Sequence, residues 1–485
     1  MKIHVNREEK CGAYYDPTRW QNSTLRYAPP EDFPAYMAKA IGRAALMRVW
    51  ITLDEYWDYR TGTVYPDYDI GVARYPVEEL HYPYDWKKIV PAPSGTRFKA
   101  YLTSHAREAD ELMLNVRRLE REVSDGVITY AQYERVFEEA VEYCKTLAPN
   151  IRYIECCNEV DIATFGNLSA DEYVKLYLCA YRAVKRLNEK HRYAIPLMIG
   201  GYAAAHPLTR FDLMREIMAR LKESEIGECP MDFYSYHHYG TSTTMQLVNH
   251  KMLSVAKLSL VERLRYMLKM HKDMLAELGL PERPIFLDEL GKARTTGIDG
   301  DALYNAAGLI VYLLALGTEE QPEMYPFPWC TFHNPELQIS FTQFLLCPDG
   351  GYAMTPNGVA VKMLHDLHGT RLSLSVGESY ARDAEYTAVA VEDDEGISVV
   401  ACNPVSESIP FELTIAGMAA GDYTVSGYHC DSSRNNSVTG HGYDGKSIEK
   451  NGEAVRRVTE GGVLRHVFAL EPNAFVHYRI TPKRV

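Results

Sequence analysis

The stretch of sequence that decides the fold is IRYIECCNEVD, residues Ile151 to Asp161. Its first half is short and apolar, which predicts a buried β-strand, and its second half turns polar at Asn158 and Glu159. Helical patterns lie on both sides of the stretch, so we predict one strand of a parallel α/β unit. In a barrel of such units, the C-terminal ends of the strands carry the chemistry. Taken alone, however, Glu159 is more simply explained as a surface residue that follows a buried strand.

The alternation of strand and helix continues in both directions from this stretch. Ala170–Lys190 is predicted to be a helix with Ser169 as its N-cap and Glu172 three residues on. The other predicted strands are Leu46–Leu53, Glu111–Arg117, Pro196–Gly201, Asp232–Tyr239, Pro284–Glu289 and Met324–Phe332. The other predicted helices are Asp32–Gly42, Phe98–Asp110, Tyr130–Leu147, Leu208–Glu223, Leu253–Leu278, Asp301–Leu316 and Asn357–Leu367. About eight such units predict an α/β fold, a closed (β/α)8 TIM barrel.

The pattern changes near Thr370 to short alternating runs, such as YTAVAV and GISVVAC, divided by Gly, Asp and Asn. These runs predict a small antiparallel β-sandwich. A chain of 485 residues is too long for one hydrophobic core. We therefore predict a catalytic barrel over residues 1–369 and an accessory sandwich over 370–485. The strand at Lys2–Asn6 could join either domain, a Tyr/Pro/Trp-rich loop follows it, and 54–98 is predicted to be an irregular excursion at the barrel mouth.

The composition excludes several classes of protein. Hydrophobic residues make up 46% and charged residues 24% of the chain, as in an ordinary soluble globular protein. The net charge of −13 argues against nucleic acid or an anionic membrane as the main partner. The segment MKIHVNREEK has no apolar core of a signal peptide, so a cytoplasmic location is predicted. The ten cysteines form no CxxC pair, and we predict reduced thiols rather than disulfides or a zinc site.

Three predicted strands end in unusual polar residues. Asn158-Glu159 ends the fourth strand, His237 and Tyr239 lie on the sixth, and Asp288-Glu289 ends the seventh. In a barrel these ends converge on one face, so Glu159 and Glu289 are predicted to face each other. Two facing carboxyl groups are what glycosidic cleavage needs, because one donates a proton to the leaving oxygen while the other attacks the anomeric carbon. In the retaining geometry they lie ~5 Å apart.

With these residues in view, the sequence resembles the clan A retaining glycoside hydrolases, and in detail glycoside hydrolase family 39, the β-xylosidase and α-L-iduronidase family. The similar stretches, which span nearly the whole chain, are RYIECCNEVD, IGGYAA, MDFYSYHHYG, IFLDELG, MTPNGVAVKMLHDLHGTR and YTVSGYHCDSSRNNS. Each motif is weak by itself, but their order and spacing together are specific.

The resemblance implies a role for each matching residue. Glu159 matches the general acid/base and Glu289 the nucleophile. Asn158 would hydrogen-bond the sugar 2-hydroxyl, and Tyr239 would hydrogen-bond the nucleophile. His237 would orient Glu159 or a sugar hydroxyl, although His238 is a rival because a shift of one residue turns a side chain to the other face of a strand.

Other residues have a structural alternative beside the functional one. Arg48 matches an arginine beneath the nucleophile, where a cation favours the ionised carboxylate, but it could equally be a structural ion-pair partner. Trp50 and Trp57 either line the sugar site or pack in the core. Asp288 is expected to be a supporting or structural group.

The sequence also departs from the family pattern. Val160 stands where the family has Pro, and the run Trp329-Cys330-Thr331-Phe332 stands where it has Trp-Thr-Phe. Either Trp329 or Cys330 therefore occupies the platform position under the sugar, and Trp329 is favoured because a thiol cannot replace a stacking ring. Glu336, in the loop beyond, could reach a sugar hydroxyl.

The resemblance implies an exo-acting retaining β-glycosidase of short oligosaccharides, with β-xylosidase the first expectation. The alternatives are the same mechanism on another sugar (β-glucosidase, β-galactosidase, arabinose-releasing or uronidase activity) or a non-catalytic carbohydrate-binding protein. The chemistry needs no metal or other cofactor, and the resemblance makes a homo-oligomer plausible.

Overall fold

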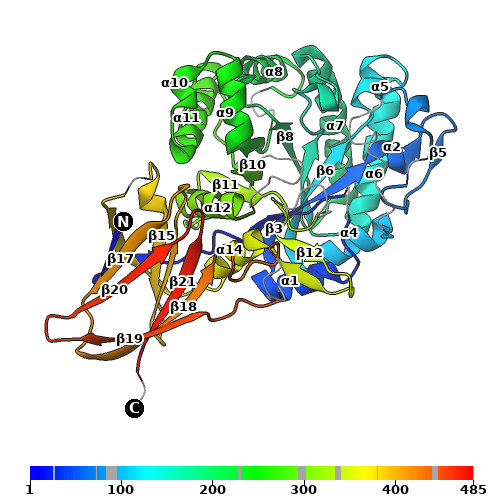
Figure 1. Cartoon of the computed structure of the whole chain (residues 1–485). Coiled ribbons are helices and arrows are strands. Elements are labelled where there is room, and N and C mark those ends of the chain that lie inside the picture. Colours follow the sequence, from blue (N-terminus) through cyan, green and yellow to red (C-terminus); the bar gives the residue numbers. More distant parts are fainter. Residues whose placement is uncertain are drawn as a thin grey trace.

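The computed structural model describes residues 1–25, 28–72, 74–82, 95–227, 231–292, 302–333, 340–379, 381–439 and 446–483. The described chain forms a ring of parallel strands surrounded by helices, packed against a second unit made of β-strands (Figure 1). This arrangement confirms the predicted TIM barrel with a C-terminal β-sandwich.

The barrel sheet runs in the order β11-β10-β9-β8-β7-β6-β3-β2, and all neighbouring strands in it are parallel. The strands are β2 (Trp20–Asn22), β3 (Ala44–Thr52), β6 (Ala109–Arg117), β7 (Ile151–Cys156), β8 (Met198–Ala204), β9 (Tyr234–Tyr239), β10 (Ile285–Gly291) and β11 (Met324–Pro328). A hydrogen bond of 2.9 Å from the Thr331 amide to the Asn22 carbonyl joins the two ends of the sheet. Strand β2 lies where a loop was predicted. It was not predicted because three residues are too few to show the period of a strand in the sequence.

Inward-facing side chains fill the barrel in layers, as the two-residue period of its strands requires. The floor is an apolar cluster of Trp20, Leu46, Met113, Phe233, Phe286 and Phe327. Two residues further along β3, β6 and β10, the next layer is polar, with Arg48, Asn115 and Asp288. Gly200 allows β8 to approach β9, because a Cβ there would lie 2.3 Å from the Phe233 carbonyl oxygen. The polar layer thus rests on an aromatic base directly below the strand ends.

Helices cover the outside of the barrel (Figure 1). They are α1 (Phe33–Ile41), α4 (Phe98–Arg107), α5 (Glu120–Ser124), α6 (Tyr130–Leu147), α7 (Ala170–His191), α8 (Phe211–Glu223), α9 (Gly240–Asn249), α10 (Leu253–Ala256), α11 (Leu260–Leu278), α12 (Ala302–Leu316) and α14 (Pro356–His365). The predicted N-cap of α7 is confirmed, since the Ser169 hydroxyl accepts from the Glu172 amide and the Glu172 carboxylate accepts from the Ser169 amide. The single helix predicted over Leu253–Leu278 is wrong. Ser259 and Glu262 form a capping box there, which starts a new helix and separates α10 from α11.

The predicted excursion at 54–98 contains short elements in its described part. They are α2 (Leu53–Tyr56), a two-stranded hairpin of β4 (Trp57–Asp58) and β5 (Thr63–Val64), and the 3-10 turn η1 (Val77–Glu79). Two further 3-10 turns, η2 (Ala163–Phe165) and η3 (Ala384–Tyr386), and the hairpin of β12 (Phe344–Leu346) with β13 (Tyr352–Met354) lie elsewhere. Trp57 is buried within the barrel core, which supports the alternative that it packs there.

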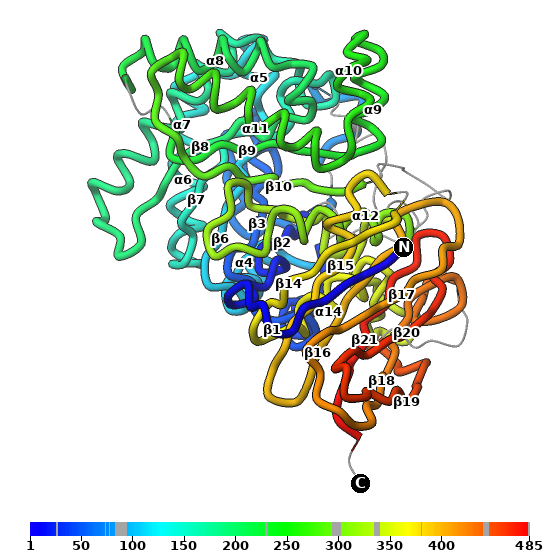
Figure 2. The backbone as a smooth tube through the Cα atoms, turned by 90° about the vertical axis from the view of Figure 1, so that its left-hand side faces the viewer, coloured from blue at the N-terminus to red at the C-terminus, as the bar shows by residue number. Residues whose placement is uncertain are grey.

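The second unit is a folded nine-stranded sheet in the order β19-β18-β21-β16-β15-β14-β1-β17-β20. Its strands are β1 (Lys2–Ala13), β14 (Thr370–Gly377), β15 (Ala388–Glu392), β16 (Ile397–Cys402), β17 (Ile409–Ala416), β18 (Gly421–Cys430), β19 (Gly452–Val458), β20 (Val463–Leu470) and β21 (Phe475–Pro482). Strand β1 lies between β14 and β17 and so joins the sandwich (Figure 2). It pairs with β17 in parallel, the one departure from the antiparallel pattern among the pairings within this sheet.

The two units share a continuous apolar contact through β16, which is buried on both faces. Val399 and Ala401 belong to the core of the sandwich, whereas Val400 and Cys402 belong to the core that surrounds the barrel. The Cys402 thiol also lies 3.8 Å from the Ala307 carbonyl oxygen on α12. Among the described helices, none combines the length and the apolar run needed to cross a membrane.

Candidate active site

The C-terminal ends of β7, β9 and β10 bring two glutamates and a histidine together. A carboxylate oxygen of Glu159, a ring nitrogen of His237 and a carboxylate oxygen of Glu289 all lie within 4.8 Å of one another. All three residues are buried, and the glutamates keep exposed fractions of 5% and 6%. Residues 130 positions apart in the sequence therefore meet at the face of the barrel where parallel strands end.

Both carboxylate oxygens of Glu289 are held by donors from other strands. The Tyr239 hydroxyl donates to Oε2 at 2.7 Å, and Arg48 Nη1 lies 3.1 Å from Oε1. The contact with Tyr239 is the one that the family resemblance implied. Because a phenol donor and a guanidinium both favour a negative charge, the surroundings of Glu289 suit an ionised carboxylate with a fixed direction.

His237 lies between the two glutamates. Its Nδ1 is 2.9 Å from Glu159 Oε1 and 3.4 Å from Glu289 Oε2. The rival His238 points outward from β9, where its Nε2 lies 3.1 Å from the Tyr312 hydroxyl on α12. The alternation of side chains along the strand separates the two histidines, so His237 is the one that contacts the carboxyl pair.

The backbone turns sharply where β7 ends. Cys157 and Glu159 have positive φ angles of 68° and 48°, which side chains with a Cβ rarely adopt. The Glu159 amide donates to the Ala203 carbonyl at 2.9 Å. Asp161, the last residue of the opening stretch, accepts from the amides of Ala205 and His206 at 2.8 and 2.9 Å. The loop is thereby tied to the end of β8, which fixes the direction of Glu159.

A buried ionic network supports this pair from below. Arg48 donates to Glu155 Oε2 from Nε at 2.9 Å and from Nη2 at 2.6 Å, and it donates to Asn158 Oδ1 at 2.9 Å. Asn115 Nδ2 also donates to Glu155 Oε2 at 2.6 Å. Glu155 and Asn115 were not among the predicted site residues. Each is a polar residue at an inward position of an otherwise apolar strand, which could have marked it as a candidate. That these residues meet Arg48 follows only from the register of the strands.

Glu155 and Asp288, two of the carboxyl groups near Arg48, have pKa values shifted in opposite directions. Burial by itself would lower the pKa of Arg48, but Asp288, Glu155 and Glu289 raise it above its ordinary value. Burial works to raise the pKa of Glu155, yet Arg48 and several hydrogen bonds outweigh it and leave that pKa lowered. In contrast, burial raises the pKa of Asp288 well above its usual range despite the nearby guanidinium. Arg48 is therefore a permanent cation, and Asp288 is the carboxyl group most disposed to hold a proton.

The aromatic residues near the site divide into one partly exposed ring and one buried ring. Trp329 is half-buried, and its ring centre lies 5.9 Å from that of Trp50. Trp50 is only 1% exposed, and its indole N–H donates to the Ser23 carbonyl at 2.8 Å. Of the two alternatives for Trp50, this burial supports packing in the core beneath the site.

Three further predicted residues of the site are Cys330 and Arg48, which are buried, and Glu336. Cys330 is fully buried, so at this turn it is Trp329 that keeps exposed surface. Arg48 is fully buried as well, and it contacts the carboxyl groups of Glu155, Asp288 and Glu289. Glu336 lies outside the described residues.

A cation that the sequence did not point to lies beside these rings. The guanidinium carbon of Arg117, at the end of β6, lies 4.3 Å from the Trp50 ring centre, and that of Arg48 lies 4.0 Å from it. Burial, together with Arg118 and Arg48, lowers the pKa of Arg117 to about 9, so it is charged at neutral pH. Within the described part of the chain, Arg117 has no carboxylate partner and its Nε is buried without an acceptor.

Glu159, His237 and Glu289 are also spaced closely enough to hold a metal ion. Their donors argue against that use, because both oxygens of Glu289 already accept from Tyr239 and Arg48. Arg48 already supplies a positive charge at this carboxylate, so a divalent ion would be repelled by the guanidinium beside it. The donor set therefore does not fit a resident metal.

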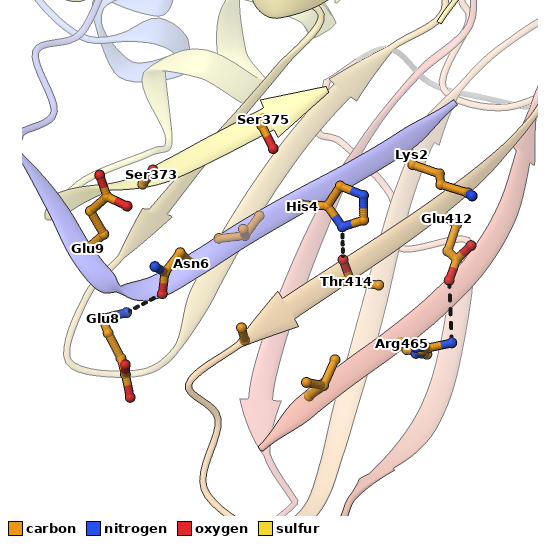
Figure 3. Close-up of a pocket in the computed structure, with 13 residues that line it drawn as sticks. Lys2, His4, Asn6, Glu8, Glu9, Ser373, Ser375, Glu412, Thr414 and Arg465 are labelled. Atoms are coloured by element: carbon orange, nitrogen blue, oxygen red, sulfur yellow. Dashed lines mark hydrogen bonds and ion pairs between the residues drawn. The ribbon is translucent and has the colours of Figure 1, made fainter. Parts of the chain in front are cut away.

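A separate hollow of about 890 Å³ lies on the outer face of the sandwich (Figure 3). Its polar side chains largely contact one another, as where His4 lies 2.6 Å from the Thr414 hydroxyl and Arg465 lies 3.8 Å from Glu412. The residues that line it include no Trp, Tyr or Phe, and so offer no ring on which a sugar could stack. The strand ends of the barrel are the better candidate for the functional site.

No protein-family model matches the chain, and no curated protein matches it. Solved structures do resemble it over its whole length. A monomeric β-xylosidase from Caulobacter crescentus CB15 superposes with a TM-score of 0.62 at 14% identity and covers 100% of both chains. An enzyme of glycoside hydrolase family 39 from Xanthomonas axonopodis pv. citri gives 0.61 at 15% identity, covering 99% of this chain and 97% of its own. A bacterial orthologue of human α-L-iduronidase gives 0.58 at 14% identity, with 99% and 84% covered. The chain thus shares its complete two-part fold with glycoside hydrolases of the family 39 type.

Proposed function

We propose that the protein is a retaining glycoside hydrolase in which Glu159 is the acid/base and Glu289 the nucleophile. The observation that carries the proposal is the approach of their carboxylate oxygens to within 4.8 Å. Retaining enzymes hold the two carboxyl groups about 5–5.5 Å apart, whereas inverting enzymes leave about 6.5–9.5 Å for a water molecule. The separation favours direct attack by one carboxylate over attack by an intervening water.

In the first step, the ionised Glu289 carboxylate attacks the anomeric carbon and forms a covalent glycosyl ester. The bond to the leaving oxygen breaks, and Glu159 gives its proton to that oxygen. Tyr239 and Arg48 keep Glu289 directed and charged before the attack. His237 bridges the two carboxyl groups and is placed to orient Glu159.

In the second step, Glu159 takes a proton from water, which attacks the anomeric carbon and releases Glu289. Two inversions leave the sugar with its original anomeric configuration. Asn158 would hydrogen-bond the 2-hydroxyl, and its own oxygen is fixed by Arg48 at 2.9 Å. Trp329 would supply the platform under the ring. No step requires a metal or an organic cofactor.

For the substrate, we propose a short oligosaccharide or glycoside cleaved from its end, with β-xylosides as the first choice. This choice is supported by the motifs of the sequence and by the β-xylosidase among the similar structures. β-Glucosides, β-galactosides and arabinosides are the alternatives, and a glucosidase from Croceicoccus marinus also shares the fold, with a TM-score of 0.62.

The decisive experiment is to trap the covalent intermediate with a 2-fluoro-xylosyl fluoride and to map the labelled peptide by mass spectrometry. We expect time-dependent inactivation with the label on Glu289, and no label on the Glu289→Gln variant. Label on another residue would overturn the assignment, as would an inverted anomer detected first by NMR during hydrolysis. If neither the wild type nor Glu289→Ala hydrolyses any of a panel of nitrophenyl glycosides, the alternative of a non-catalytic carbohydrate-binding protein with this fold is favoured.

The acid/base assignment has its own test. Glu159→Ala should retain activity on substrates with very good leaving groups, because these depart without a proton, and should lose it on natural oligosaccharides. Added azide should restore the rate by replacing the water that the variant can no longer activate, and the product should be a glycosyl azide. An unchanged rate on oligosaccharides would refute the role of Glu159.

A second candidate keeps the mechanism but places an acidic sugar in the site. It is favoured by Arg117, a buried cation beside Trp50 with no carboxylate partner in the described residues. A substrate carboxylate would complete this pair. Under this candidate, Arg117→Met lowers kcat/KM on a nitrophenyl uronide by roughly 10- to 150-fold, the equivalent of one charged hydrogen bond, and changes neutral glycosides little. Equal losses on neutral and acidic glycosides would assign Arg117 a structural role.

A further inference from the structure

One guanidinium in the barrel faces three carboxyl groups. Arg48 Nη2 lies 2.6 Å from Glu155 Oε2 and 3.0 Å from Asp288 Oδ2, and Arg48 Nη1 lies 3.1 Å from Glu289 Oε1. The side chains of Arg48, Glu155 and Asp288 are fully buried. A single positive charge cannot compensate three buried negative charges, and an uncompensated charge in such surroundings takes up a proton instead. The balance of charge around Arg48 therefore favours a neutral form for at least one of the three carboxyl groups.

The hydrogen bonds identify which one. Glu155 Oε2 accepts from Arg48 and Asn115, and Glu289 accepts from Tyr239 and Arg48. Neither oxygen of Asp288 accepts a hydrogen bond from any residue in the described chain, and Glu155 Oε1 also lacks a donor there. Among the described residues, His237 also lies against Asp288, with its Nε2 3.7 Å from Oδ1. A proton on Asp288 would give Glu155 its missing donor.

We propose that Asp288 is a positioning residue, held as a neutral carboxylic acid that donates a hydrogen bond to Glu155. Arg48 then faces two anions in place of three, and its Nη1 remains available to Glu289. An ionised Asp288 would put a like charge directly beside Glu289 in the sequence and would compete for the same guanidinium. The raised pKa of Asp288 and the lowered pKa of Glu155 agree with this distribution of the proton.

The direct test uses infrared difference spectroscopy at neutral pH on protein labelled with 13C-aspartate. We expect a carbonyl band of a protonated carboxylic acid that shifts with the label and is lost in Asp288→Asn. The matched control is Asp431→Asn. Asp431 is also buried but is paired with Arg434, and its pKa is lowered, so this variant should leave the band unchanged. A carbonyl band that is the same in wild type and in Asp288→Asn would overturn the proposal. A carbonyl band that shifts with 13C-glutamate labelling and is lost in Glu155→Gln would also overturn it, because the proton would then lie on Glu155.

A second measurement covers the case in which Asp288→Asn alters the fold, because it compares only active protein. Replacement of a neutral acid by a neutral amide should leave the midpoint of the acid limb of kcat/KM in place. Loss of an ionised Asp288 would instead lower that midpoint by about one pH unit or more, because a like charge beside Glu289 would be gone. This second readout rests on the proposed function, whereas the infrared band does not. If no glycoside is hydrolysed, the infrared result still decides where the proton lies.

Discussion

Replacement of Arg48 by methionine should destabilise the protein strongly. Methionine fills similar space but removes the guanidinium that contacts Glu155, Asp288 and Glu289, and both Arg48 and Glu155 are fully buried. Removal of one partner of a buried ion pair costs about 3–5 kcal/mol, because the remaining charge has neither water nor a counter-ion. We expect a loss in that range at pH 7 to 8, together with loss of glycosidase activity.

The loss should depend on pH in a definite direction. Arg48 lowers the pKa of Glu155 in the folded protein, so its stabilising effect is present above the unfolded-state pKa of about 4.3 and disappears as the pH falls below it. In the variant, burial without a cation raises the pKa of Glu155, and protonation then relieves the cost as the solution becomes acidic. The difference in unfolding free energy between wild type and variant should shrink steadily from pH 8 towards pH 4.

The assay is urea unfolding, followed in parallel by tryptophan fluorescence and far-UV circular dichroism at several pH values. Arg220→Met is the matched control. Arg220 lies on the surface of α8 at 2.7 Å from Glu216, and an exposed pair of this kind contributes under about 1 kcal/mol. A loss below about 1 kcal/mol for Arg48→Met, or a loss that does not vary with pH, would refute the proposed charge balance.

Three further variants test other parts of the structure. Tyr239→Phe should lower kcat/KM by roughly 10- to 150-fold by removing the donor to Glu289, whereas Tyr312→Phe, which removes the partner of His238, should change it little. Ser169→Ala should lower the unfolding free energy by about 1 kcal/mol in urea by removing the N-cap of α7, and no change would contradict the capping box. Ile3→Ala should lower it by about 2–5 kcal/mol because Ile3 lies in the core of the sandwich, whereas the exposed His4→Ala should be nearly neutral; equal effects would contradict the register of β1.

Much of the fold could be predicted because each strand–helix unit carries its own signal. The stretch at Ile151–Asp161 is apolar and then polar, and the same change at Asp288-Glu289 marks a second strand end. Since the C-terminal ends of barrel strands converge, those two local signals were enough to predict that the glutamates meet. Elements without a period were missed, as with the three residues of β2.

The support beneath the glutamates could not be predicted in the same way. Glu155 lies only four residues before Glu159, yet its partner Arg48 is 107 residues away, and the strand register decides that they meet. Arg117 could not be predicted either, for a different reason. Its distinguishing property is that it has no carboxylate partner among the described residues, and no sequence pattern indicates that. In contrast, the helix break before α11 was available in the sequence, since Ser259 and Glu262 have the spacing of a capping box.

The position of β1 has a consequence for how the chain is made. Lys2–Asn6 pairs with Glu412–Ala416, and the Met1 amino group donates to the carbonyl of Pro410, 409 residues later, at 2.8 Å. At synthesis rates of roughly 5–20 residues per second, the partner leaves the ribosome on the order of 20–80 s after the strand does. The barrel strands and their helices emerge in order during this delay, while the edges of β1 and its apolar side chains Ile3 and Val5 have no partner strand. Newly made protein therefore exposes both edges of β1 until β14 appears and one edge until β17 appears, which is the period in which β1 could pair with another chain.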